Sequence, residues 1–201
     1  MNKAENLVYK LCHRSFLSLW SYANPKGKEG KELCDILVVC DPDIIIFSVK
    51  EIKIAKTGKY SLDKSRWQKR AIEKSCSQIY GAERWINSAK NVIRKDGTIG
   101  LAFPESSLRR IHRVAIALGS QGKIGIKFGD FGKGFIHVFD EQSLDIIMSE
   151  LDTISDFIEY LTSKEYCYKN GIKTHFSGGE EDLGNYKRSA TGLVSRLINN
   201  S

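Results

Sequence analysis

The chain has 201 residues, of which 41% are hydrophobic and 27% charged, and its formal net charge is +7. This composition is typical of a globular protein with one sizeable core and excludes a disordered or acidic solvating chain, while it permits a polyanionic partner. No apolar run approaches the about 18 residues of a membrane span, so no membrane partner is expected. The five cysteines are scattered and never form a C-x-x-C pair. Together with the lack of an apolar leader, they indicate reduced thiols and a cytoplasmic location.

Hydrophobic periodicity and turn residues predict helices and strands that alternate along the chain. In chain order, we expect a helix over Lys3–Trp20, a loop over Asn24–Gly30, strands over Leu33–Val39 and Ile44–Ile54 around an Asp41-Pro42-Asp43 turn, a helix over Lys64–Asn87, a strand pair within Val92–Phe103, strands over Arg113–Leu118, Lys123–Phe128 and Phe135–Phe139, and a helical pattern over Glu141–Tyr166. The short turn makes the first two strands an antiparallel hairpin. This order predicts an α/β fold with a mixed central sheet flanked by helices over residues 1–140. An acidic helical extension and a poorly patterned tail follow over 141–201.

The charge is unevenly distributed along the chain. Residues 50–95 carry thirteen basic and four acidic side chains, a net charge of +9, directly after the stretch 35–49, whose net charge is −3. Residues 140–201 have a net charge of −5. A lysine-rich stretch is either a solvated helix face or a surface for a polyanion. The position of the basic residues along the chain is therefore more informative about a partner than the total net charge.

Several common catalytic and binding motifs are absent from the sequence, including the G-x-S-x-G elbow, the G-x-x-x-x-G-K-[ST] phosphate loop and H-E-x-x-H. The glycine-rich stretch Gly129–Gly134 precedes no predicted helix, so we expect an ordinary turn and not a phosphate cradle. The four histidines lack metal-ligand spacing. His112 and His137 fall on strand-like segments that can be neighbours, and we expect a structural role for them.

The predicted hairpin carries charged residues in an unusual place. Asp35 stands at the head of the first apolar strand and Lys50 at the end of the second, so both lie at the same end of the hairpin. Ser48 and Lys50 share a face because side chains alternate along a strand. Asp35, Lys50 and the backbone carbonyl of Val49 together can hold Mg²⁺ and activate a water. The plainer alternatives are that Asp35 caps a loop and that Lys50 is an exposed edge lysine.

Three features stand in order along the chain: a helix bearing Glu5, a strand bearing Asp35 and a strand ending in Ser48-Val49-Lys50. This order resembles the PD-(D/E)xK nuclease superfamily, in a bacterial branch with Ser-x-Lys in place of acid-x-Lys. The resemblance covers roughly residues 3 to 90 and implies a restriction-endonuclease-like α-β-β-β-α-β core. It also implies that Asp35 is the principal ligand of Mg²⁺ or Mn²⁺, that Glu5 is an auxiliary carboxylate, and that Lys50 orients or deprotonates the attacking water.

The resemblance departs at Ser48, where the family has an acid. Some members recruit a glutamate from the following helix, and Glu73 and Gln78 are the candidates here. At about 100° per residue, Gln78 falls at the edge of the apolar arc and Glu73 faces away from it. We therefore expect Gln78 to meet the sheet and Glu73 to be solvated. Glu5 lies on the flank of the buried stripe of its own helix, where it is either a metal ligand or a complement to the helix N-terminus.

The basic stretch can contact phosphates, and Trp67 can stack on a base if it is exposed, although its place near the apolar arc favours core packing. The residues expected to bind nucleic acid are Lys53, Lys64, Arg66, Lys69, Arg70 and Lys74. The predicted function is metal-dependent hydrolysis of phosphodiester bonds, with DNA favoured over RNA. The alternatives are an inactive module that binds nucleic acid or a partner, and a toxin or defence effector domain. The sequence allows a dimer without requiring one.

Overall fold

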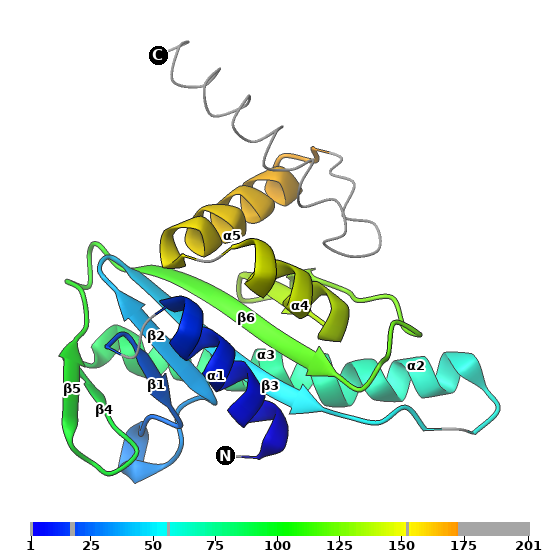
Figure 1. The fold of residues 1–201 in the computed structure, drawn as a ribbon, viewed down its shortest axis with the longest axis horizontal. Coiled ribbons are helices and arrows are strands. Elements are labelled where there is room, and N and C mark those ends of the chain that lie inside the picture. Colours follow the sequence, from blue (N-terminus) through cyan, green and yellow to red (C-terminus); the bar gives the residue numbers. More distant parts are fainter. Residues whose placement is uncertain (1, 17–18, 56, 152, 173–201) are drawn as a thin grey trace.

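A mixed sheet with helices on both faces forms the centre of the structure, a computed structural model that describes residues 2–16, 19–55, 57–151 and 153–172 (Figure 1). The predicted α/β class is confirmed. The described strands of this sheet, in spatial order, are β1 (Ser21–Ala23), β2 (Ile36–Cys40), β3 (Asp43–Glu51), β6 (Arg110–Leu118), β8 (Phe135–Phe139) and β7 (Gly129–Asp130). A separate hairpin pairs β4 (Asn91–Ile93) with β5 (Ile99–Ala102), which confirms the strand pair predicted within Val92–Phe103.

The predicted antiparallel hairpin is confirmed as β2 and β3, whose register runs from Cys40↔Asp43 at the turn to Ile36↔Phe47. On its other edge β3 pairs in parallel with β6 along its whole length. Because β3 lies between two strands and its residues Asp43–Val49 are buried, it reads as a nearly continuous apolar run. Its position fixes the chain direction and the side-chain alternation of the strand that carries Ser48 and Lys50.

Helices cover the two faces of the sheet and build two cores. On one face α1 (Lys3–Phe16), α4 (Glu141–Glu150) and α5 (Ile154–Lys169) pack on side chains that include Ile45, Phe47 and Val49. On the other face α2 (Tyr60–Gln68) and α3 (Lys74–Ser88) pack on the alternate residues, such as Ile44 and Ile46. The segment that follows residue 140 therefore packs on the same sheet as the N-terminal helix. Its tail beyond residue 172 lies outside the described residues.

The helix predicted over Lys64–Asn87 begins earlier and contains an irregular turn. A π-helical turn, η2 (Lys69–Glu73), joins α2 to α3, and the whole runs from Tyr60 to Ser88. Trp67 is buried and its Nε1–H donates to the carbonyl oxygen of Ile52 at 2.8 Å. This confirms that Trp67 packs in the core and is not available to stack on a base.

Three local predictions need correction. The first helix is described over Lys3–Phe16 and does not reach Trp20, because Leu19 and Trp20 form a turn. Ser21–Ala23 forms the short strand β1, which is too short to show a periodicity in the sequence. A 3-10 turn, η1 (Lys28–Gly30), lies in the predicted loop. The stretch Lys123–Phe128 is not a strand. Gly122 and Gly125 weaken its strand propensity, and β8 pairs instead with Gly129–Asp130.

The turn that joins β7 to β8 is organised by one carboxylate. Asp130 Oδ1 accepts hydrogen bonds from the backbone N–H groups of Gly132 and Gly134, at 2.6 and 3.1 Å. Strand β8 follows directly, so the glycine-rich stretch is the ordinary turn that the sequence predicted. Among the described helices, none is long and apolar enough to cross a bilayer.

Two histidines lie on the neighbouring strands β6 and β8, as the sequence allowed, and their side chains are on the face of the sheet that α5 covers. His112 on β6 contacts Asp43 Oδ1 at 2.7 Å through Nε2. His137 on β8 is fully buried, and within the described part of the chain neither of its ring nitrogens has a hydrogen-bond partner. Burial, and then the charge of nearby Lys164, hold the pKa of His137 well below its usual 6.5. The structure therefore keeps this ring neutral.

We expect the neutral ring of His137 to make the protein less stable in mild acid. The unfolded chain binds a proton near pH 6.5 that the native state refuses, so the free energy of unfolding falls as pH drops below that value, with a slope of up to about 1.4 kcal/mol per pH unit. Urea unfolding between about pH 5 and 7 measures this slope. His137→Phe should reduce the slope, whereas the exposed control His13→Gln should not. An unchanged slope in His137→Phe would contradict the assignment.

Candidate functional site

The site is organised around the carboxylate of Asp35, which lies directly before β2 and is 2% exposed. Its backbone N–H continues the strand pairing by donating to the carbonyl oxygen of Phe47 at 3.2 Å. One carboxylate oxygen, Oδ2, accepts from the Val49 backbone N–H at 2.6 Å and from Lys50 Nζ at 3.2 Å. Asp35 and Lys50 therefore converge at one end of the hairpin, as the strand alternation predicted.

Helix α3 closes the site with the carboxamide of Gln78. Its Oε1 accepts from Ser48 Oγ at 2.7 Å and from Lys50 Nζ at 2.8 Å, and its Nε2 lies 3.4 Å from Asp35 Oδ1. The prediction that Gln78 meets the sheet is confirmed, and Glu73 is exposed as expected. The structure thus joins Asp35, Ser48, Lys50 and Gln78 in one hydrogen-bonded network, named here the Asp35 network.

The other two predicted metal-binding groups differ in their placement. The N–H and C=O of one strand residue point to the same side, so the Val49 carbonyl lies on the edge of β3 that faces Asp35. Glu5 instead pairs with Asn2 at the start of α1. Its Oε2 and Oε1 accept from the Asn2 backbone and side chain at 2.9 and 2.6 Å. These contacts fit the helix-end role that was the alternative for Glu5, and its role as a metal ligand stays a prediction. 

No protein-family model, curated protein or solved structure matches this chain. The chemistry of the site therefore follows from the geometry of its own residues. A negative carboxylate, a lysine and an amide that fixes both are gathered where a buried strand pair opens, which is an arrangement suited to holding a cation, a phosphate or a water.

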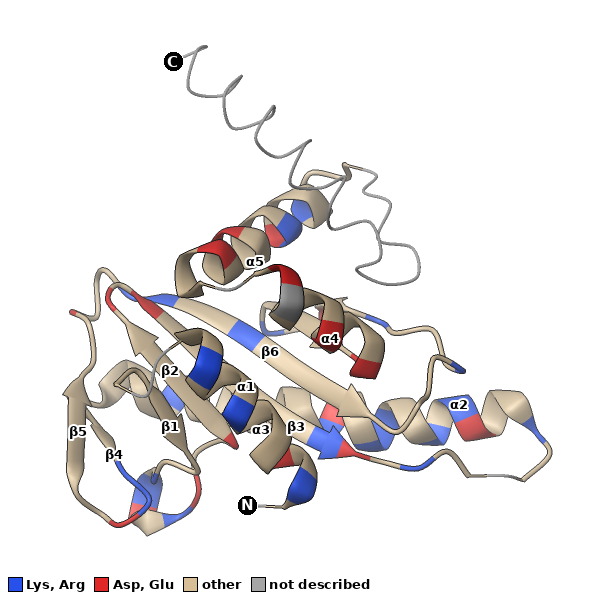
Figure 2. Ribbon diagram, viewed as in Figure 1, with Lys and Arg blue, Asp and Glu red and all other residues tan. Residues whose placement is uncertain are grey.

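The predicted phosphate contacts lie after β3 and along the helical segment from α2 to the start of α3. Five of the six are exposed and Lys64 is partly buried, and none of them forms an ion pair with a described acid. Lys74 lies one helical turn before Gln78 and is the basic residue on α3 nearest to the network. Figure 2 shows Lys and Arg along α2 and at the end of β3, and Asp and Glu on α4 and α5. The six predicted residues are Lys53, Lys64, Arg66, Lys69, Arg70 and Lys74.

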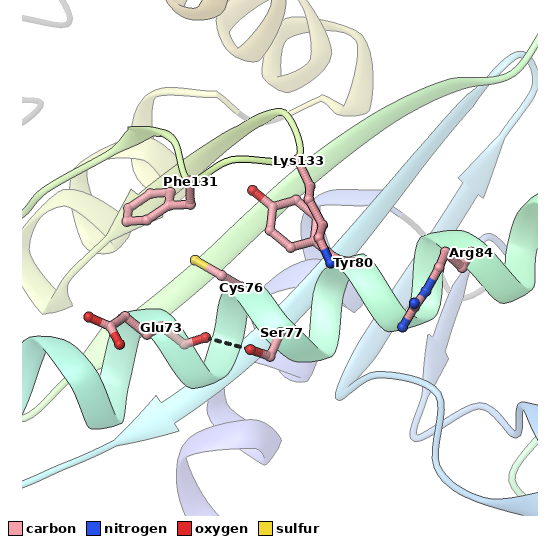
Figure 3. Close-up of a pocket in the computed structure, with 7 residues that line it drawn as sticks. All are labelled: Glu73, Cys76, Ser77, Tyr80, Arg84, Phe131 and Lys133. Atoms are coloured by element: carbon pink, nitrogen blue, oxygen red, sulfur yellow. Dashed lines mark hydrogen bonds between the residues drawn. The ribbon is translucent and has the colours of Figure 1, made fainter.

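A pocket of about 490 Å³ lies on the other side of α3 (Figure 3). By the rotation of about 100° per residue, its residues on α3 face away from Gln78. Burial raises the pKa of the Cys76 thiol to about 11, so no thiolate nucleophile is present there at neutral pH. The Asp35 network, which combines a buried acid with a lysine, is therefore the better candidate. The pocket is lined by Glu73, Cys76, Ser77, Tyr80, Arg84, Phe131 and Lys133.

The donor set at Asp35 fits Mg²⁺ or Mn²⁺ in chemistry. The carboxylate of Asp35 and the carbonyl of Val49 are hard oxygen ligands, which these ions prefer. Across the described residues, no group of three or more His, Cys, Asp or Glu side chains is arranged to hold a metal. Mg²⁺ is usually held by one or two carboxylates, with water and substrate phosphate completing its shell, so a sparse site is compatible with it.

Sequence reasoning missed two residues beside the network. Glu32 precedes β2 and accepts from Asn24 Nδ2 at 2.8 Å, while the Asn24 backbone N–H donates to the Asp35 carbonyl oxygen at 2.9 Å. Partial desolvation, and then the charge of Asp35, raise the pKa of Glu32. The only feature of the sequence that pointed to Glu32 was its position three residues before Asp35. Its proximity depends on a loop that returns along β1, which periodicity does not reveal.

Removing Lys50 should destabilise the fold because it leaves the buried charge of Asp35 without its ion pair. We expect Lys50→Met to lower the free energy of unfolding by about 1–3 kcal/mol, below the about 3–5 kcal/mol of a fully buried pair, since the Lys50 side chain is 27% exposed. Urea denaturation measures the change. The matched control, Lys53→Met, removes an exposed lysine that follows the same strand and should change stability by less than about 0.5 kcal/mol. Equal losses in both variants would show that the ion pair contributes nothing specific.

Proposed function

We propose that this protein is a metal-dependent nuclease that hydrolyses phosphodiester bonds, with DNA as its substrate. The observation that carries the proposal is the contact of Lys50 Nζ with both Asp35 Oδ2 and Gln78 Oε1, at 3.2 and 2.8 Å. A lysine held between a carboxylate and an amide has a fixed position from which to meet a phosphate or a water. We also propose a cytoplasmic location, since all five cysteines are free thiols.

Each residue of the network has a separate role in this proposal. Asp35 and the Val49 carbonyl hold Mg²⁺ or Mn²⁺, which supplies Lewis-acid polarisation of the phosphoryl group and lowers the pKa of water. Lys50 orients the attacking water and stabilises negative charge that develops on the phosphate. Gln78 fixes the Lys50 head group, and the Ser48 hydroxyl fixes the Gln78 carboxamide by donating to it. Ser48 thereby acts as a positioning residue.

The order of elements also supports the proposal. Helix α1, strands β1–β3, the α2–α3 helix and then β6 follow the helix–strand–strand–strand–helix–strand order of the PD-(D/E)xK core, with the β4–β5 hairpin inserted before β6. Asp35 lies directly before β2, and Lys50 is the penultimate residue of β3. Asp35, Ser48 and Lys50, which carry most of the resemblance, also form the network on which the proposal depends.

The proposed activity can be tested on plasmid, single-stranded DNA and RNA with Mg²⁺ or Mn²⁺. Wild-type protein should cleave DNA, and Asp35→Asn and Lys50→Met should each reduce the rate at least about 100-fold, because each removes a group that acts on the reacting phosphate or its cation. Lys95→Met, an exposed lysine near β4, serves as the matched control and should cleave normally. Cleavage that persists in both site variants would show that the activity arises elsewhere. Cleavage of RNA alone would overturn the choice of DNA.

Salt dependence tests the basic surface independently of cleavage. Each phosphate contact releases counterions, so the double variant Lys69→Gln/Arg70→Gln should reduce the slope of log K against log salt by about 1–2 for DNA binding. Fluorescence anisotropy of a labelled duplex in Ca²⁺ or without metal measures this. The control Lys90→Gln/Lys95→Gln alters two exposed lysines beyond the other end of α3 and should leave the slope unchanged. Equal slopes in all three proteins would mean that the Lys69–Arg70 region is only a solvated face.

A non-catalytic module that binds nucleic acid is the second candidate, and Ser48 favours it. The position where the resembling family has an acid holds a hydroxyl that is fully buried and donates to Gln78. Binding of DNA without cleavage, under conditions where the salt slope depends on Lys69 and Arg70, would favour this candidate over the nuclease.

A further inference from the structure

The strand β3 provides no acid at its end on the side of the Asp35 network. Ser48 is fully buried and its hydroxyl donates to Gln78 Oε1, so this oxygen is already engaged. Glu51 falls on the opposite face from Lys50. If a second carboxylate serves the site, it must come from another element that reaches Asp35.

Asn24 brings such a carboxylate to the same place. It follows β1, its backbone N–H donates to the Asp35 carbonyl oxygen, and its Nδ2 donates to Glu32 Oε2. The return of the chain is fixed by the pairing of Lys26 with Glu32 and by the Leu33 N–H, which donates to the Pro25 carbonyl at 2.8 Å. Asn24 therefore contacts both residues: its side chain donates to Glu32 and its backbone N–H donates to Asp35.

The carboxamide of Asn24 also presents an oxygen that nothing satisfies. Asn24 is 4% exposed, and its Oδ1 has no hydrogen-bond partner among the residues that the structure describes. This oxygen belongs to the same carboxamide whose nitrogen donates to Glu32 Oε2 at 2.8 Å. An unsatisfied buried oxygen costs free energy that a cation or an ordered water recovers.

The local charge balance points to a cation. Asn24 contacts both Glu32 and Asp35, and after desolvation the charge of Asp35 is the next cause that raises the pKa of Glu32. Lys50 forms an ion pair with Asp35, whereas Glu32 forms none with any lysine, arginine or histidine of the described segments. The two carboxylates of Glu32 and Asp35 against the one ammonium of Lys50 leave an excess of negative charge, and the available donors are hard oxygens.

We propose that Glu32, held by Asn24, is the second carboxylate of the divalent-cation site at Asp35 and replaces the acid that is absent at Ser48. This inference rests on the proposed function, because it assigns a ligand to the same cation. It differs from the alternative in which a helix residue compensates for Ser48: the compensating acid comes from the loop between β1 and β2, and Gln78 holds Lys50 instead.

Metal binding without substrate provides the test. Titration calorimetry with Mn²⁺ and the shift of the unfolding midpoint on adding Mn²⁺ are measured for wild type, Glu32→Gln and Glu29→Gln. Glutamine keeps an oxygen that accepts from Asn24, so the loop should stay folded. We expect Glu32→Gln to bind Mn²⁺ about 10- to 100-fold more weakly and to lose most of the Mn²⁺-induced stabilisation. Its unfolding midpoint without metal should be equal or higher, because a like-charge contact is removed.

Glu29→Gln is the matched control, since Glu29 is an exposed acid of the same loop that pairs with Lys28 and Lys31. It should bind Mn²⁺ as wild type does. Equal Mn²⁺ affinity in wild type and Glu32→Gln would overturn the assignment of Glu32 and leave the proposed nuclease standing if wild type still cleaves DNA. Loss of Mn²⁺ binding in Glu32→Gln without cleavage by wild type would support the cation site and remove the nuclease. Absence of Mn²⁺ binding by wild type would overturn both.

Discussion

A buried carboxylate at the point where a strand pair ends is the constraint on which this site depends. The charge of Asp35 needs compensation because almost none of its side chain reaches water. Its partners, the Val49 N–H and the Lys50 ammonium, both come from the end of β3. The register that pairs Ile36 with Phe47 therefore also sets the ion pair, and a slip by one residue would turn Lys50 to the other face of the sheet.

The hydroxyl of Ser48 changes how the sheet is coupled to α3. By donating to Gln78 Oε1 it orients the carboxamide, whose oxygen then also accepts from Lys50 and whose nitrogen is turned toward Asp35. An acid at this position would bring a second negative charge to the same face as Asp35 and would compete with it for Lys50. With serine at this position, the carboxylate nearest to Asp35 is that of Glu32, in the loop between β1 and β2. The group that α3 brings to Asp35 is the neutral carboxamide of Gln78.

The sequence was sufficient to predict those parts of the site that local periodicity determines. Alternation along β3 placed Ser48 and Lys50 on one face, and helical rotation selected Gln78 over Glu73, even though the π-helical turn over Lys69–Glu73 was not foreseen. That turn ends before α3 begins, so the rotation between Lys74 and Gln78 is that of a regular helix. The α/β class followed from the same patterns.

What periodicity could not predict depends on contacts between distant segments. The three residues of β1 are a strand because β2 pairs with them, and this pairing brings Asn24 and then Glu32 to Asp35. The Lys123–Phe128 stretch shows the reverse case. Its apolar residues alternate as in a strand, but its glycines and the competing pair β7–β8 leave it without a partner in the sheet.

The uneven distribution of charge over the helices bears on how a polyanion would approach. Basic residues lie along α2 and the end of β3. On the opposite face of the sheet acidic residues lie on α4 and α5, whereas α1 on that same face carries Lys3, Lys10 and Arg14 (Figure 2). At physiological salt the charge of α4 and α5 is screened beyond about 8 Å, so it can disfavour contact with these two helices without weakening contact elsewhere. Long-range attraction is screened in the same way. The orientation of a bound strand over Lys50 would therefore depend on direct phosphate contacts by exposed basic side chains such as Lys74, one helical turn before Gln78, with the net charge of +7 as a secondary influence.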